Sequence, residues 1–180
     1  MEWLIIGFIV MMVISPVMWL KPSPRQHRHT QLRAMARHKG VEVARQEVAL
    51  HVIKGKMPAY RLRYPGEHPG PDFVLVRDAV ASTALARYVE GWRFRIAPLR
   101  PLPEAAQGQL AVLVALLPSD VLMVQSSEVA LTLWWGESAT AERFAPCIDA
   151  AGALRDALSG YADRSGVKPL TTPSVASRSR

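Results

Sequence analysis

Residues 121–158 read VLMVQSSEVALTLWWGESATAERFAPCIDAAGALRDAL, and this stretch decides the fold. Two runs rich in apolar and β-branched side chains, 121–125 and 129–135, are joined by a short serine-containing turn, which predicts a β-hairpin. Across residues 138–158 the apolar side chains recur at helical spacing, which predicts a helix. A hairpin followed by a helix predicts a sheet against which that helix packs.

The sequence upstream repeats both patterns. Period-2 alternation or a short apolar run predicts further strands at residues 48–52, 60–64, 73–76 and 92–96. Helices are predicted at residues 79–90, between a capping Asp78 and Gly91, and at residues 103–117, before Pro118. The fold class we expect is therefore α+β, with a small antiparallel or mixed sheet at residues 41–163 and helices packed on one face.

The N-terminal segment is apolar and uncharged from Trp3 to Leu20, and ten of these eighteen residues are Leu, Ile, Val or Phe. A helix of this length spans roughly 27 Å, close to the thickness of a bilayer core. No basic residue precedes the run and no small-x-small site follows it, so a cleaved signal peptide is disfavoured. We expect residues 1–20 to form a single transmembrane anchor.

A basic juxtamembrane segment, residues 21–40, follows the anchor. By the positive-inside rule it places the N-terminus outside and the domain in the cytoplasm. Within it, residues 30–39 are expected to form a short helix with Leu32, Met35 and Ala36 on one face. This helix either lies on anionic headgroups or is a solvated linker. The expected membrane-surface contacts are Lys21, Arg25, Arg28, Arg33, Arg37 and Lys39.

The charge distribution argues against a nucleic-acid partner. The net charge of the chain is +7, but residues 41–164 hold thirteen Lys or Arg and fourteen acidic residues. The basic excess therefore lies in the flanks, where it suits a membrane surface better than a DNA-binding face. Residues 164–180, rich in Ser, Thr and Pro, are expected to be a disordered tail.

No catalytic residue is assigned. Residues 136–140 approach the G-x-S-x-G nucleophile elbow, but Thr140 replaces the last glycine and the last histidine, His68, lies upstream. Ser138 is better explained as a helix N-cap. Cys147 has no evident activating base and is expected to be a small core residue.

No cofactor-binding or metal-binding residue is assigned either. His27, His29 and His38 lack a cysteine or acid that would complete a site, and no phosphate-binding glycine motif is present. Trp134 and Trp135 should point to opposite faces of a strand, so one is expected in the core. The other is a candidate partner contact or a cover for a helix.

The chain reads Leu20-Lys21-Pro22-Ser23-Pro24-Arg25 at the end of the apolar segment and Lys39-Gly40-Val41-Glu42-Val43 after the basic stretch. This arrangement resembles YajC, the small accessory subunit of the bacterial Sec preprotein translocase. That family has one N-terminal helix, a Leu-Arg-Pro exit, a basic helix and Lys-Gly-Asp-Glu-Val at the same distance. Here Lys21 replaces its Arg and Val41 its Asp, and its Gly-Gly turn is absent. The resemblance implies a bacterial inner-membrane protein with Sec components as partners.

We therefore expect a membrane-tethered, non-enzymatic interaction domain of the inner membrane, such as an accessory subunit of the Sec machinery. Its expected partners are the lipid bilayer and a membrane protein. The alternative is a membrane-anchored enzyme or ligand-binding domain whose site no motif reveals. An exposed apolar patch near Trp134 or Trp135 would favour the interaction domain, and a conserved polar cluster in a pocket would favour the alternative.

Overall fold

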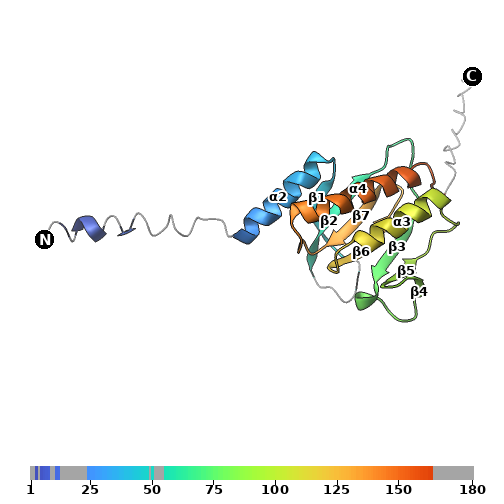
Figure 1. Cartoon of the computed structure of the whole chain (residues 1–180), viewed down its shortest axis with the longest axis horizontal. Coiled ribbons are helices and arrows are strands. Elements are labelled where there is room, and N and C mark those ends of the chain that lie inside the picture. The colour runs from blue at the N-terminus through green and yellow to red at the C-terminus, as the bar shows by residue number, and fades with distance from the viewer. Residues whose placement is uncertain are drawn as a thin grey trace, which may run out of the picture.

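The computed structural model describes residues 24–48, 50 and 55–163, and in the N-terminal segment residues 3, 5–8 and 11–12 (Figure 1). The side chains of Pro24 and Arg25 are excepted. In chain order the elements are α2 (Pro24–His38), β1 (Glu42–Glu47), β2 (Lys56–Arg63), β3 (Phe73–Arg77), the 3-10 helix η1 (Asp78–Val80), β4 (Ala86–Val89), β5 (Trp92–Ile96), α3 (Glu104–Leu116), β6 (Val121–Ser126), β7 (Ala130–Trp135) and α4 (Ala141–Leu158).

The seven strands form one sheet in the order β1-β2-β7-β6-β3-β5-β4, and every neighbouring pair is antiparallel. Helices α2, α4 and α3 lie side by side on one face, with α4 in the middle and in contact with both others (Figure 1). The α+β class and the hairpin of β6 and β7 are therefore as predicted. The predicted helices of the C-terminal half also form, as α3 and α4.

The sheet is buried on both faces, and β7 shows this best. Leu131, Leu133 and Trp135 pack into the core beneath the helices. Trp134 joins a second cluster on the opposite face, whose other members are Val48, Leu50, Ala59, Val74, Val76 and Met123. The expectation that one of the two tryptophans is exposed, as a candidate partner contact or a cover for a helix, is therefore wrong. Both indoles are buried because chain segments cover the second face as well.

The helix predicted at residues 79–90 does not form. Arg93 of β5 donates hydrogen bonds to the carbonyl oxygens of Thr83 and Leu85, at 3.0 and 2.9 Å, and its Nε to Asp78 at 2.9 Å. These bonds hold the chain in a loop, after which β4 pairs with β5. A tertiary partner thus replaces the local hydrogen bonds that a helix would need.

The other boundaries differ less. The strand predicted at residues 48–52 is wrong where the structure describes it, because β1 is Glu42–Glu47 and neither Val48 nor Leu50 is in a strand; residues 49 and 51–54 lie outside the described part of the chain. Helix α2 begins at Pro24 rather than at Thr30. Proline is tolerated at the first position of a helix, because the backbone N–H that it lacks would have no partner within the helix.

The transmembrane prediction is corrected. Among the residues that the structure describes, no helix has both the length and the apolar character needed to cross a membrane. This finding contradicts the predicted single-pass anchor and the predicted inner-membrane location. Most of the predicted anchor, and the predicted tail at residues 164–180, lie outside the described residues.

A buried hydrogen-bond chain fixes the loop after β2. Ser126 Oγ donates to the carbonyl oxygen of Pro71 at 2.6 Å, and Tyr64 donates its hydroxyl to Ser126 Oγ at 2.8 Å. Burial raises the pKa of Tyr64 to about 12, which keeps this phenol protonated as a donor. The ring of Tyr64 lies directly over Gly70, where a Cβ would collide with it.

We therefore expect Gly70→Ala to lower the free energy of unfolding by about 2 kcal/mol, because the added methyl group must displace a packed, hydrogen-bonded ring. Gly66→Ala is the matched control, since a Cβ there meets open space in the same loop. Urea denaturation of both variants measures the difference. If Gly70→Ala is as stable as Gly66→Ala, the ring of Tyr64 moves aside at no cost.

Candidate functional site

The loop from β7 to α4 carries a strained acidic residue, Glu137. Its φ is +61°, which no other non-glycine residue adopts in the described part of the chain. Asp120 fixes the loop on both sides, because its carbonyl oxygen accepts from Gly136 N at 3.2 Å and its Oδ2 accepts from Ser138 N at 3.0 Å. A Cβ on Gly136 would lie 2.9 Å from Asp120 Oδ2, so a larger residue there would have to displace the carboxylate that holds the loop. The surrounding structure thus imposes the strain.

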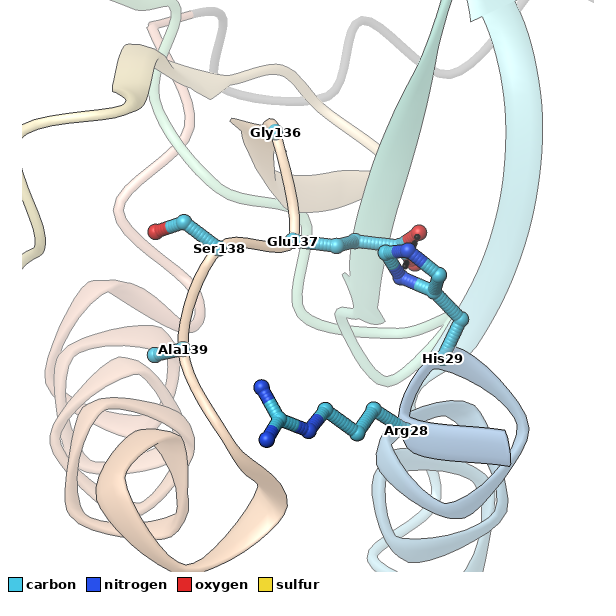
Figure 2. A pocket seen from close by; sticks show the side chains of 6 residues that line it. All are labelled: Arg28, His29, Gly136, Glu137, Ser138 and Ala139. Atoms are coloured by element: carbon cyan, nitrogen blue, oxygen red, sulfur yellow. Dashed lines mark ion pairs between the residues drawn. The ribbon is translucent and has the colours of Figure 1, made fainter. Parts of the chain in front are cut away.

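The side chain of Glu137 points away from Ser138, toward α2 (Figure 2), and is only 3% exposed. Arg33 binds it in a bidentate pair, with Nε 2.8 Å from Oε1 and Nη2 2.6 Å from Oε2. Tyr60 of β2 donates its hydroxyl to Oε1 at 2.8 Å. His29 places Nδ1 3.1 Å from Oε2, an ion-pair distance when the imidazole is protonated. We call these four side chains the Glu137 cluster.

The electrostatics of the Glu137 cluster keep the carboxyl group ionised. Burial alone would raise the pKa of Glu137, but the hydrogen bonds from Arg33 and Tyr60 and the charges of Arg33 and His29 outweigh it, so this pKa lies below its ordinary value. Burial and the neighbouring carboxylate raise the pKa of Tyr60, which therefore stays a donor. Oε1 accepts from Arg33 and Tyr60, and Oε2 accepts from Arg33 with the His29 ring beside it, so Glu137 in this arrangement joins α2 to the sheet.

Two pockets flank the β7–α4 loop. One, of about 410 Å³, is lined by Arg28 and His29 of α2 and by residues 136–139 (Figure 2). The other, of about 360 Å³, is lined by Leu116, Pro118, Ser119, Ser138, Ala139 and Arg143. The two pockets share Ser138 and Ala139 of this loop, and the second is also lined by Leu116, the last residue of α3.

The outward side of α3 is mostly apolar. Its buried side packs Ala106, Leu110, Leu113 and Val114 into the core. Its outward side exposes Gln107 and six residues without polar side chains, which we call the α3 face, namely Ala105, Gly108, Ala111, Val112, Ala115 and Leu116. Val112 is 50% and Leu116 48% exposed, and Glu104 is the one charged residue of the helix. An apolar helix side that the rest of the fold leaves uncovered presents a contact surface.

The structure gives different surroundings to the four described side chains among the six basic residues predicted to contact a membrane. Arg33 is committed to Glu137, and Lys39 pairs with Asp149. Arg28 lines the larger pocket, and Arg37 is exposed beside Gly40. Lys21 and the side chain of Arg25 lie outside the described part.

The apolar face of α2 is part of the fold. Leu32 and Ala36 are buried in the core and Met35 packs against it, so these side chains do not face a lipid surface. A helix with one apolar face has the same sequence pattern whether it lies on a membrane or on a sheet. The contacts of α2 with α4 and β1 show that its apolar face packs on the domain.

The two side chains considered as nucleophiles, Ser138 and Cys147, lie in different environments. Ser138 is exposed but does not cap α4, because Thr140 occupies the N-cap position and makes no side-chain capping bond. Cys147 is buried, as predicted, and its thiol donates to the carbonyl oxygen of Leu116 at 3.3 Å. Burial raises the pKa of Cys147, which disfavours the thiolate.

The three histidines of α2 have different surroundings. His27 and His38 are exposed, and His29 faces Glu137. Within the described residues no three potential metal ligands come together.

Sequence reasoning missed both main features of this site. Arg33 and Glu137 are separated by 104 positions, so no local pattern connects them. The α3 face did leave a signal, since the run from Ala105 to Leu116 holds no charged residue and a helix with one wet side normally carries several.

Comparison with protein-family models, with curated proteins and with solved structures finds no match to this chain. The resemblance of the N-terminal residues to YajC therefore stays a prediction from the sequence, as does the expected link to the Sec machinery.

Proposed function

We propose that this chain is a non-enzymatic protein-interaction domain that binds its partner through the α3 face. The observation that carries the proposal is the half-exposure of Val112 and Leu116 on a helix side that holds no charge between Ala105 and Leu116. Covering two such side chains contributes about 1 kcal/mol each, since roughly half of each remains to be buried.

The surroundings of the α3 face support this role. Glu104 stands at one end and Arg143 and Ser138 at the other, beside the pocket that Leu116 lines. An apolar centre with a polar rim is the usual composition of a protein–protein interface. The exposed apolar surface of α3 supports the proposal in place of the patch expected near Trp134 or Trp135, since both of these indoles are buried.

The chemistry of the β7–α4 loop points the same way. Glu137 is held by Arg33 and Tyr60, and Ser138 has no hydrogen bond from its hydroxyl to a base among the described residues. The observation that favours the alternative, a ligand-binding domain, is the larger pocket with Arg28 and His29 in its wall.

Site-specific photo-crosslinking tests the proposal. A benzophenone amino acid at position 112 of the full chain is expected to give discrete adducts with protein in the producing cells, because this position lies at the centre of the α3 face. Val129 is the matched control, a valine of similar exposure, 53%, in the turn between β6 and β7. The proposal fails if position 112 yields no adduct, or only the adducts that position 129 yields.

A further inference from the structure

We infer that the α3 face binds a second copy of this chain, with the two α3 helices packed antiparallel about a two-fold axis. This inference rests on the proposed function and names its partner. In a two-fold interface the same surface of each copy contacts that surface of the other copy. The surface must therefore be self-complementary in shape and in charge.

The shape condition is met at the middle of the helix. Gly108 and Val112 lie one turn apart on the α3 face, and a Cβ on Gly108 would meet no atom within 4 Å. In an antiparallel pair whose axis passes between these positions, Val112 of each copy fills the space above Gly108 of the other. The absence of a side chain at Gly108 lets the two backbones approach closely.

The charge condition is met at the two ends. Glu104 begins α3, and Arg143 lies beside Leu116 at the other end of the helix, where both line one pocket. Both side chains are exposed, and neither has an ion-pair partner among the described residues.

Antiparallel packing brings Glu104 of each copy toward Arg143 of the other, so the complementary contact occurs twice. Parallel packing would place like charges together. The charges therefore favour a second copy in one orientation over an arbitrary apolar partner.

The length of the helix sets the expected affinity. Thirteen residues span roughly 20 Å, and an interface built on one such helix lies near the small end of specific interfaces, roughly 1,000 Å² in total. We expect a dimer with a dissociation constant on the order of micromolar, in exchange with monomer.

Sedimentation velocity of the purified full chain over a range of micromolar concentrations measures this dimer. Val112→Glu is expected to weaken association at least tenfold, because it buries a carboxylate against the other helix near the centre of the interface, whereas Val129→Glu leaves it unchanged. Glu104→Arg and Arg143→Glu are each expected to weaken it, and the double variant Glu104→Arg/Arg143→Glu to restore it. Circular dichroism confirms that each variant is folded.

Restoration in the double variant separates antiparallel α3 packing from unspecific association of apolar segments. The inference is overturned if the wild-type chain is monomeric at these concentrations, if Val129→Glu weakens association as much as Val112→Glu, or if the double charge exchange restores nothing. If the chain is monomeric while position 112 still crosslinks to a different protein, the proposed function stands and only the choice of partner is wrong.

Discussion

Replacing Glu137 with glutamine is expected to lower the free energy of unfolding by about 3 kcal/mol at neutral pH. The change keeps the size of the side chain but removes the charge that compensates Arg33. It also turns an amide N–H₂ group toward groups that are themselves donors, Arg33 and Tyr60. Removing one partner of a buried ion pair costs about 3–5 kcal/mol, and the lower end applies because Arg33 is one-third exposed.

The effect of this substitution should depend on pH. The pKa of Glu137 is lower in the folded chain than in the unfolded chain, so ionised Glu137 stabilises the fold fully above its unfolded pKa, at about 4.5. That contribution is lost as the pH falls through the folded pKa. The difference in free energy of unfolding between the wild type and Glu137→Gln should therefore be largest at pH 7 and should decrease below about pH 4.5.

Urea denaturation at pH 7 and at pH 3 measures both effects. Glu142→Gln is the control, since Glu142 is an exposed acid in the first turn of α4 and its replacement should change little. A loss at pH 7 no larger than that of the control would mean that the Glu137 cluster does not hold α2 on the sheet.

The elements that the sequence predicts well are those whose pattern is local. In β7, the alternation of Leu131, Leu133 and Trp135 faces the helices and is visible in the order of the residues. The apolar runs of α3 and α4 are equally visible. Residues 79–90 mislead, because their outcome depends on Arg93, which binds two carbonyl oxygens of the loop from a neighbouring strand.

The candidate site is hardly predictable from one sequence, for the same reason. Glu137 takes its strained conformation from Asp120, its charge partner from α2 and its hydroxyl donor from β2, and these three elements are far apart along the chain. The tryptophans of β7 show the complementary case. Their alternation is read correctly, but nothing local to Trp134 indicates that other segments cover the second face.

Replacing Leu32 with alanine is expected to lower the free energy of unfolding by about 3 kcal/mol, because Leu32 is 1% exposed and its loss leaves a cavity between α2 and the sheet. Gln31→Ala is the matched control, since Gln31 is the exposed neighbour on the same helix and alanine favours the helix at least as well. Urea denaturation measures both variants, and hydrogen exchange of the α2 amides reports whether the helix opens with the domain. A helix that only links the domain to other segments would tolerate both changes equally. If the two variants are equally stable, α2 does not pack as part of the folded core. The Glu137 cluster would then not be the contact that holds α2 on the sheet.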